Sequence, residues 1–442
     1  MRSSEAEVAR GQSVRGSSRA LSMIGRFGWG LGDQLLSSIT NFLLGLLVAR
    51  AVSPRELGAF SLAYATFTLS LGAIRTMAGE LLVVRHSAVS AAEWRYGVKR
   101  AAGTALMAGL IVGVGCMVAG AIVGGSLRIL LSILGICLPG LLVQDVARYG
   151  FFARGKGSAA VLNDLLWAVV MFAAFALLRQ AGLSSVAWFT LAWAGAGLLA
   201  AVVALFQLRA LPSGPLSAIK WLRQNRDLAS RYVAEFALNV GVANLIIFAI
   251  GTVAGLGQLG RLRAGQIALG PLNILFGGAG LVATPEGVRL LRESPKRLVH
   301  GCRWMSLVLA SGVLAWGAVV LSIPRGVGEL VLGGNWEGAR SLLVPLLIGL
   351  TGSAFAFGAW AGLRSLAAAR RSLRARCIDA SLSLSFGVLG AYMAGATGAA
   401  WAFAVAGCLR IPNAWWQFSR GLREYDRRDQ TGAVLDPISD AL

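Results

Sequence analysis

The chain has few charged residues for its length. Only 14% of its 442 residues are Asp, Glu, Lys or Arg, whereas soluble domains carry about 25%. Apolar residues make up 56% of the chain, glycine occurs 57 times, and the mean hydropathy is +0.68. This shortage of charge excludes an ordinary soluble domain, and it predicts that most of the chain lies in a lipid bilayer.

Residues that bind metals or carry out catalysis are also scarce. The two histidines, His86 and His300, have no partner at metal-ligand or catalytic spacing. The five cysteines form no CxxC motif, which excludes a disulfide framework and a cysteine metal site. A Walker A sequence is missing, so we do not expect ATP hydrolysis. The sequence therefore favours a protein that is not an enzyme and needs no metal or organic cofactor.

Hydrophobic runs account for most of the chain. Each run is close to the length of about 20 residues that a helix needs to cross a bilayer. The sequence thus predicts an all-α polytopic membrane protein with about 12 transmembrane helices. The predicted spans are 28–49, 57–84, 102–125, 129–147, 158–178, 185–207, 232–254, 264–285, 304–323, 341–363, 377–394 and 396–418.

The net charge of +21 is explained by topology. With the N-terminus in the cytosol, most of the 41 Lys and Arg residues fall in segments on the cytosolic side, which is the positive-inside pattern. We therefore expect a multi-pass protein of the cell (inner) membrane with both termini in the cytoplasm. Nucleic-acid binding, the other common reason for a basic chain, is not expected.

A polar segment between the sixth and seventh spans divides the chain in two. Its Pro-rich start and basic amphipathic sequence predict a helix that lies on the inner leaflet. The predicted parts are a cytosolic basic N-terminal segment, 1–24, an N-terminal six-helix bundle, 25–208, a cytosolic interfacial linker, 209–231, a C-terminal six-helix bundle, 232–419, and a cytosolic tail, 420–442.

The first two spans carry polar residues at depths that lipid does not tolerate. Asp33 and Asn41 share one stripe of the first span, and Arg75 and Glu80 lie in the second. An ionised side chain at the centre of a bilayer costs about 2.5–3.5 kcal/mol, so these residues must face other helices or water. One interpretation is that Asp33 and Arg75 form an interhelical lock; the other is that they line a pathway.

A second hairpin, 144–167, has similar chemistry. Asp145 and Arg148 are three residues apart on one helix face and can pair locally, and Asp164 enters the membrane on the next helix. The turn 154–157 places two cations at the inner surface. They are either part of an ordinary positive-inside loop or line an inner vestibule for an anionic ligand.

The second half of the chain has fewer such residues. Glu235 and Asn239 are four apart on one face of the seventh predicted span. Arg410 lies inside the last span, next to Pro412, where a cavity or a partner must compensate its charge.

The hairpin formed by the first two spans has a recognisable motif: Ala49-Arg50 ends the first span, and Pro54-x-Glu56 and Gly58-x-Phe60 open the second. This motif resembles the first hairpin of polysaccharide transporters in the multidrug/oligosaccharidyl-lipid/polysaccharide exporter superfamily. The second hairpin is similar to the fourth and fifth helices of bacterial members. The matching residues there are Gln144, Asp145, Arg148, Phe151, Phe152, Ala153, Gly155, Asp164 and Trp167.

The resemblance implies two six-helix bundles that face each other across a central cavity. It also implies movement of an undecaprenyl-diphosphate-linked oligosaccharide from the inner to the outer leaflet, for surface polysaccharide biosynthesis. The chain departs from the family at Arg261 and Arg263, where members have few charges, and Glu235 has no role that the resemblance supplies.

For that function we expect three arginines, Arg75, Arg148 and Arg410, to bind the diphosphate, because a guanidinium binds phosphate bidentately. The remaining residues expected along the pathway are Asp33, Asn41, Glu80, Asp145, Asp164, Glu235 and Asn239. The acidic ones would hold the arginines in one state or carry a coupling proton or sodium ion. The expected partners are the bilayer, the lipid-linked glycan, and glycosyltransferases or a polymerase of the same pathway.

Three other functions remain open at this stage. A multidrug exporter of the same fold would favour acidic and aromatic linings for cations, whereas the deepest charges here are Arg75 and Arg410. A membrane glycosyltransferase or glycan polymerase needs catalytic carboxylates in a large outer loop, and the longest outer loop, 324–340, holds only Glu329 and Glu337. A structural partner of such enzymes would not need charges inside the membrane.

Overall fold

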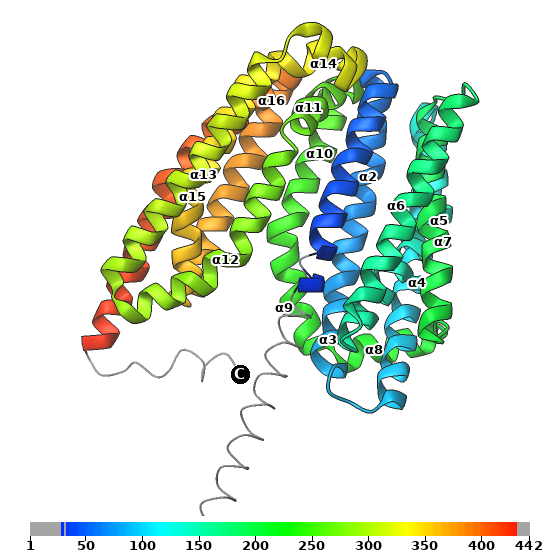
Figure 1. The fold of residues 1–442 in the computed structure, drawn as a ribbon, viewed down its shortest axis with the longest axis horizontal. Coiled ribbons are helices and arrows are strands. Elements are labelled where there is room, and N and C mark those ends of the chain that lie inside the picture. Colours follow the sequence, from blue (N-terminus) through cyan, green and yellow to red (C-terminus); the bar gives the residue numbers. More distant parts are fainter. Residues whose placement is uncertain (1–27, 31, 431–442) are drawn as a thin grey trace, which may run out of the picture. The chain divides into compact units, whose positions relative to one another are not determined.

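A computed structural model describes residues 28–30 and 32–430, and it leaves undescribed the side chains of residues 231, 234, 235, 238, 239 and 428–430. The described residues form helices and no strand, which confirms the all-α prediction (Figure 1). The predicted N-terminal segment, 1–24, and residues 431–442 of the predicted tail lie outside the described residues.

The helices in chain order are the N-terminal helix Gly28–Ala51, α2 Pro54–Ile74, the π-helical turn η1 Arg75–Gly79, α3 Glu80–His86, α4 Ala91–Val123, α5 Gly125–Ala153, α6 Gly157–Gln180, α7 Val186–Leu208, α8 Pro215–Gln224, α9 Arg226–Phe236, the π-helical turn η2 Ala237–Gly241, α10 Val242–Val253, α11 Leu256–Ala268, α12 Pro271–Glu293, α13 Pro295–Ser322, α14 Arg325–Leu332, the 3₁₀ turn η3 Gly333–Asn335, α15 Trp336–Ser365 and α16 Ala369–Gln430.

In the described part of the chain, ten helices are long and apolar enough to cross a membrane. The last of these is two helices, because Ala394 and Gly395 have non-helical backbone angles and Gly395 has a φ of +60°. The helix from Arg226 to Val253 runs through η2 and adds one more of spanning length. The total matches the twelve predicted spans.

The predicted spans 232–254 and 264–285 differ most from the helices observed. Only Val242–Val253 of the first is a continuously apolar helix, because α9 before it is rich in charge. The second is divided between α11 and α12, with a break before Pro271. Proline has no N–H to continue the ladder of α11, and its fixed φ suits the first turn of a new helix.

Contacts along the chain define two compact units. Unit 1 contains residues 1–41, 70–183 and 187–233, and unit 2 contains 42–69, 184–186 and 234–442. The residues from Phe42 to Leu69, part of the predicted first bundle, are thus grouped with the second half of the chain. The predicted division into bundles at 25–208 and 232–419 stays a prediction.

The first-hairpin motif lies in unit 2, where its residues have distinct structural roles. Ser53 and Glu56 form a capping box that starts α2, with the Ser53 N–H and hydroxyl donating to Glu56 Oε2 at 2.9 and 2.8 Å. The Asn335 amide donates to the carbonyls of Ala49 and Val52 at 2.7 and 2.8 Å. These two carbonyls lie at and just beyond the end of the N-terminal helix Gly28–Ala51, where carbonyl groups lack helical partners.

Two glycines allow α2 and α11 to touch backbone to backbone. A Cβ on Gly58 would lie 1.9 Å from the Leu256 carbonyl oxygen, and a Cβ on Gly260 would lie 1.7 Å from the Pro54 carbonyl oxygen. Neither position can hold a larger residue while the helices keep this contact. The Gly58 of the sequence motif is therefore required by a helix crossing within unit 2.

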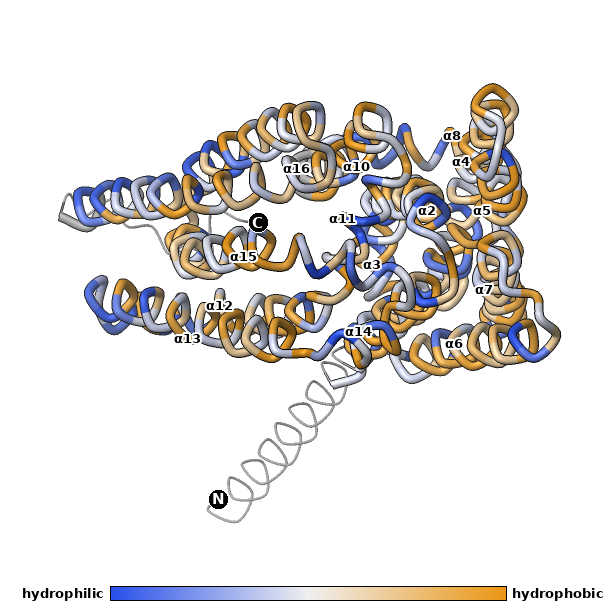
Figure 2. Tube along the Cα trace, turned by 90° about the horizontal axis from the view of Figure 1, so that it is seen from above, coloured by the Kyte–Doolittle hydropathy of each residue, from blue (hydrophilic) through white to orange (hydrophobic). Residues whose placement is uncertain are grey.

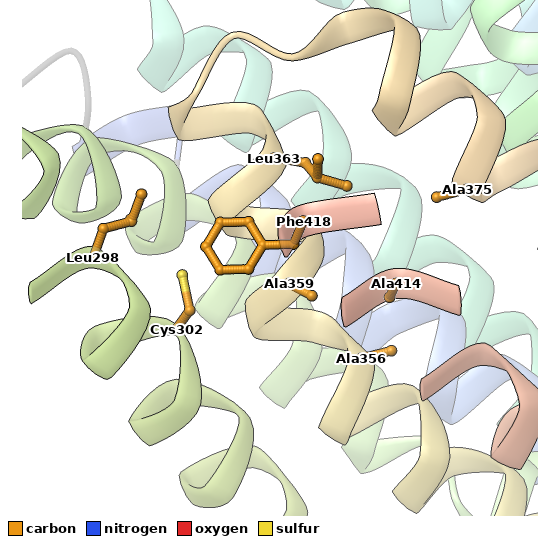
Figure 3. Packing of buried hydrophobic residues seen from close by; sticks show 8 residues of the cluster. All are labelled: Leu298, Cys302, Ala356, Ala359, Leu363, Ala375, Ala414 and Phe418. Carbon is orange, nitrogen blue, oxygen red and sulfur yellow. The ribbon is translucent and has the colours of Figure 1, made fainter. Parts of the chain in front are cut away.

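Small residues also let α13, α15 and α16 pack closely in unit 2. Gly358 lies against Cys302, where a Cβ would come within 1.9 Å of the Cys302 carbonyl oxygen. Figure 3 shows the ring of Phe418 surrounded by the smaller side chains of this core. The buried cluster consists of Leu298, Cys302, Ala356, Ala359, Leu363, Ala375, Ala414 and Phe418.

The outer faces of the helices are apolar. Large hydrophobic side chains such as Ile122 and Phe206 are 79% and 78% exposed. Figure 2 shows hydrophobic residues along the lengths of the helices, with hydrophilic residues gathered near many of their ends. A surface of this kind suits contact with lipid rather than water.

Candidate functional site

Unit 1 contains a buried group of charged side chains, which we call the ion cluster. It consists of Asp33 from the N-terminal helix, Arg75 from η1, Asp145 and Arg148 from α5, and Asp164 from α6. Each was predicted from the sequence to lie along the pathway, and the structure brings all five together. Three carboxylates and two guanidinium groups face one another there.

Arg75 and Asp145 form the tightest pair of the cluster. Arg75 Nε donates to Asp145 Oδ2 at 2.9 Å, and Nη2 donates to Oδ1 at 2.7 Å. This is the bidentate fork that makes arginine–carboxylate pairs strong. The Asp145 side chain is 3% exposed, whereas that of Arg75 is 34% exposed. One edge of the Arg75 guanidinium is therefore committed to Asp145, and part of the side chain remains accessible.

Arg148 lies among all three carboxylates. Its Nη2 is 3.1 Å from Asp33 Oδ2, and its Nη1 is 3.5 Å from Asp145 Oδ1 and 3.6 Å from Asp164 Oδ2. The predicted local pair between Asp145 and Arg148 is confirmed. The suggested lock between Asp33 and Arg75 is wrong in its partners, because Asp33 pairs with Arg148 and Arg75 pairs with Asp145.

Neutral polar side chains complete the surroundings of Asp164. The Ser37 hydroxyl donates to Asp164 Oδ2 at 3.1 Å, and Gln144 Nε2 donates to Asp164 Oδ1 and to Asn163 Oδ1, both at 3.0 Å. The Asn163 amide in turn donates to the Ala200 carbonyl of α7 at 2.9 Å. Two buried atoms of the cluster, Asp33 Oδ1 and Arg148 Nε, have no hydrogen-bond partner.

The helix that carries Arg75 is distorted where the arginine lies. The five residues of η1 form a π-helical turn between α2 and α3, and the Glu80 N–H bonds to the Arg75 carbonyl five residues back. Gly79 packs flat on Tyr149, where a Cβ would lie 2.9 Å from the ring. Such turns are rare and often occur at functional sites. Hydrophobic periodicity gave no sign of this one.

The other residues predicted along the pathway have different surroundings. Asn41 is exposed on the N-terminal helix, and Glu80 is half-buried at the start of α3. The side chains of Glu235 and Asn239 lie outside the described residues. Two cations of the predicted inner vestibule, Arg154 and Lys156, are exposed, and Arg154 stacks on Trp94 at 5.5 Å.

Unit 2 holds a second pair, between Asp379 and Arg410 of α16. Arg410 Nε is 3.8 Å from Asp379 Oδ2, which is too long for a hydrogen bond, and neither atom has a partner. Arg410 instead bonds to the hydroxyls of Ser353 and Ser383 and lies 5.7 Å from the Trp360 ring centroid. Asp379 was missed by the sequence analysis because it lies at the very start of a predicted span.

A further arginine, Arg263 of α11, is partly buried. Its Nη1 donates to Gln266 Oε1 at 2.9 Å, and its buried Nε has no hydrogen-bond partner. No described carboxylate forms an ion pair with it. In the sequence, Arg263 stands out only as a departure from the family pattern, just before the predicted span 264–285.

The described ranges contain no group of three or more His, Cys, Asp or Glu side chains arranged to hold a metal ion. In the ion cluster, the place between the carboxylates is taken by Arg148. The cation that faces these three carboxylates is therefore a side chain of the protein itself.

No protein-family model matches the chain, and no curated protein matches its sequence. Several solved structures, however, are similar to the chain. A multidrug resistance MATE family transporter of the MOP superfamily, in an inward-facing conformation, is 14% identical with a TM-score of 0.66, over 89% of this chain and 96% of that one. The lipid II flippase MurJ, in an inward closed conformation, is 11% identical with a TM-score of 0.67, over 90% of each chain.

A third similar structure is a MOP superfamily transporter from Pyrococcus furiosus, described by the reverse polarity of its binding pocket. It is 11% identical with a TM-score of 0.51, over 90% of this chain and 93% of that one. These likenesses agree with the resemblance that the first two hairpins predicted. The chain has the fold of the MOP-superfamily transporters.

Proposed function

We propose that the chain is a membrane transporter that moves a polyprenyl-diphosphate-linked oligosaccharide from the inner to the outer leaflet, by alternating access of two helix bundles. The observation that carries this proposal is Arg263, a partly buried cation of α11 that no described carboxylate neutralises. An unpaired buried cation is costly. An anionic cargo would remove that cost when it binds.

The chemistry of the cargo explains why such a protein needs cations. A lipid diphosphate carries negative charge next to a large polar glycan, and neither crosses hydrocarbon unaided. Arginine suits this cargo because its planar fork of donors matches a phosphate bidentately. In this proposal Arg75, Arg263 and Arg410 contact the diphosphate in the course of transport.

The arginines differ in how available they are. Asp145 occupies Nε and Nη2 of Arg75, so the opposite edge of that guanidinium can face the cargo. Arg148 is enclosed by three carboxylates, and its side chain is only 13% exposed. We therefore assign Arg148 the role of holding Asp33, Asp145 and Asp164 together, and we assign Arg75 the contact with cargo.

The ion cluster also suggests how transport is coupled. With every group ionised, its three carboxylates and two guanidiniums leave one negative charge uncompensated. A proton or a sodium ion would balance that charge, and its binding would weaken the attraction of the acidic residues for an arginine and so release it. Coupling to an ion gradient fits a chain that has no Walker A sequence.

The setting of the protein follows from the same proposal. It lies in the cell (inner) membrane with both termini in the cytoplasm, and it receives its lipid-linked glycan from glycosyltransferases or delivers it to a polymerase. Surface polysaccharide biosynthesis is the process that these partners share.

A second function, export of drugs or other small molecules, has its own support. A similar solved structure is a multidrug resistance transporter. The net negative charge of the ion cluster would also suit a cationic drug. A cationic cargo would leave Arg263 uncompensated, and for that reason we favour the anion.

Transport by purified protein in liposomes tests the two functions against each other. We expect translocation of an undecaprenyl-diphosphate-linked oligosaccharide, and we expect Arg263→Ala to abolish it. Arg325→Ala is the matched control, because Arg325 is exposed and paired with Glu329 and Glu337. Uptake of a cationic drug without movement of the glycolipid would overturn the proposal and establish the second function.

A further inference from the structure

The linker helix α8 is fixed to unit 1 by a buried tryptophan. The linker was predicted to form a helix that lies on the inner leaflet, but the side chain of its Trp221 is only 2% exposed and is buried within unit 1. The exposed apolar residues of α8 are Leu216 and Ile219. Trp221 therefore belongs to the protein interior, and lipid contact does not explain it.

Trp221 bonds to the turn that carries Arg75. Its indole Nε1 donates to the Met77 carbonyl at 3.1 Å, and Met77 is the middle residue of η1. A π-helical turn widens the helix, and a side chain that inserts into the helical ladder is one cause of such distortion. The indole N–H supplies a donor for a carbonyl inside this turn.

The helix α8 is anchored at its C-terminal end, beyond Trp221. Arg100 Nη1 donates to Gln224 Oε1 at 2.8 Å, and Arg85 Nη1 donates to the Gln224 carbonyl at 3.1 Å. The His86 ring lies 5.5 Å from the indole ring of Trp221. These contacts hold the end of α8, and the His86 ring packs beside the indole that bonds to η1.

The extra residue of the π-helical turn decides where Arg75 points. Each residue of an α-helix turns the chain by about 100°, so loss of the extra residue would change the direction of the Arg75 side chain relative to α3. The bidentate bond to Asp145 depends on that direction. We propose that Trp221 is a positioning residue, which holds η1 open and so aims Arg75 at Asp145 and at the diphosphate of the cargo. The part of this inference that concerns cargo rests on the proposed function.

A double-mutant cycle on cargo binding tests this role. The probe is undecaprenyl diphosphate, and its affinity for the purified full chain is measured in detergent. Trp221→Phe keeps the ring and loses the N–H donor, so we expect binding to weaken about fivefold, the effect of one neutral hydrogen bond. In an Arg75→Ala background the same substitution should cause no further loss. Equal losses in both backgrounds would overturn the inference.

Trp94→Phe is the matched control. Trp94 is also buried in unit 1, and its indole Nε1 donates to the Gly150 carbonyl at 3.2 Å. It makes the same kind of bond, but to a carbonyl of α5 rather than of η1. We expect its effect on probe affinity to be unchanged by Arg75→Ala. A dependence on Arg75 as strong as that of Trp221 would show that any buried indole has this effect, and it would refute the specific role.

A second cycle needs no cargo. It combines Trp221→Phe with Asp145→Asn and measures the thermal unfolding midpoint in detergent. If Trp221 acts through η1, the double variant should lose less than the sum of the two single losses. Additive losses would overturn the inference. Failure of the wild-type chain to bind the probe would count against the proposed function, while this second cycle would still decide the role of Trp221.

Discussion

The two buried arginine–aspartate sites of this protein satisfy their charges in different ways. In the ion cluster of unit 1, Arg75 and Asp145 share two short hydrogen bonds, and Arg148 is within 3.6 Å of three carboxylates. In unit 2, Arg410 and Asp379 are 3.8 Å apart and are not hydrogen-bonded to each other.

The difference shows what each site can do. A network in which most groups are bonded can change only by exchanging partners, because an uncompensated buried charge is expensive. A loose pair, by contrast, has donor and acceptor atoms to spare. We therefore expect the unit 1 cluster to dominate stability and coupling, and the unit 2 pair to be adjustable when cargo binds.

The strongest way to break this contrast is Asp145→Asn. This change leaves Arg75 without its charged partner and takes one carboxylate from Arg148. Breaking a buried ion pair from one side costs about 3–5 kcal/mol, and we expect a loss of that order in the free energy of unfolding. Thermal unfolding in detergent would measure it as a large fall in the midpoint.

The control for that prediction is Asp227→Asn. Asp227 also pairs with an arginine, Arg85, at 3.0 Å, but its side chain is 60% exposed. Exposed pairs contribute about 0–1 kcal/mol. Similar losses for Asp145→Asn and Asp227→Asn would mean that burial of the unit 1 cluster does not matter.

Arg148→Lys should have the next largest effect. A lysine keeps the charge but replaces the wide guanidinium by one ammonium, which cannot reach three carboxylates at once. We expect a loss of about 2 kcal/mol in stability, the scale of a hydrogen bond to a charged group. The exposed Arg297, paired with Glu293, gives the control Arg297→Lys, which should leave the unfolding midpoint unchanged.

Asp379→Asn should cost less than either change in unit 1. The substituted amide keeps an oxygen for the Asn413 Nδ2, which now donates to Asp379 Oδ1 at 3.0 Å. The attraction to Arg410, at 3.8 Å, and to Arg376 is weakened, and we expect a loss of about 1 kcal/mol. If Asp379→Asn destabilises the protein as much as Asp145→Asn, the two sites are equivalent and the contrast fails.

Ser37→Ala is expected to have the smallest effect. It removes one of the two neutral donors to Asp164, and Gln144 remains. A loss of about 0.5 kcal/mol would follow from a single partly buried hydrogen bond. Ser341→Ala, which removes an exposed hydroxyl bonded to the Gly338 carbonyl, should show no loss. A large loss for Ser37→Ala would make the serine an essential member of the ion cluster.

The sequence predicted the members of the unit 1 cluster and one of their pairs, but not the partners of Asp33 and Arg75. The pair between Asp145 and Arg148 follows from spacing on one helix, which is local information. The partners of Asp33 and Arg75 depend on how helices distant in sequence pack, and on the π-helical turn. Periodicity assumes a regular helix, so it could not locate that turn.

The sites in unit 2 were harder to predict for a different reason. Hydropathy windows set span ends only to within a few residues, so Asp379 was placed at a boundary and given no role. The break before Pro271 was likewise absorbed into one predicted span, 264–285. Number and type of helices were predicted well, because both depend on composition summed over many residues.

The crossing of α2 and α11 at Gly58 and Gly260 has a consequence for how these two helices can move against each other. Because backbone packs on backbone at this crossing, no side chain would have to change its rotamer if α2 and α11 separated or came together again. Only weak Cα–H···O attractions join such surfaces. A single added methyl group at either glycine would collide with the facing backbone, and it would keep α2 and α11 farther apart than they are here.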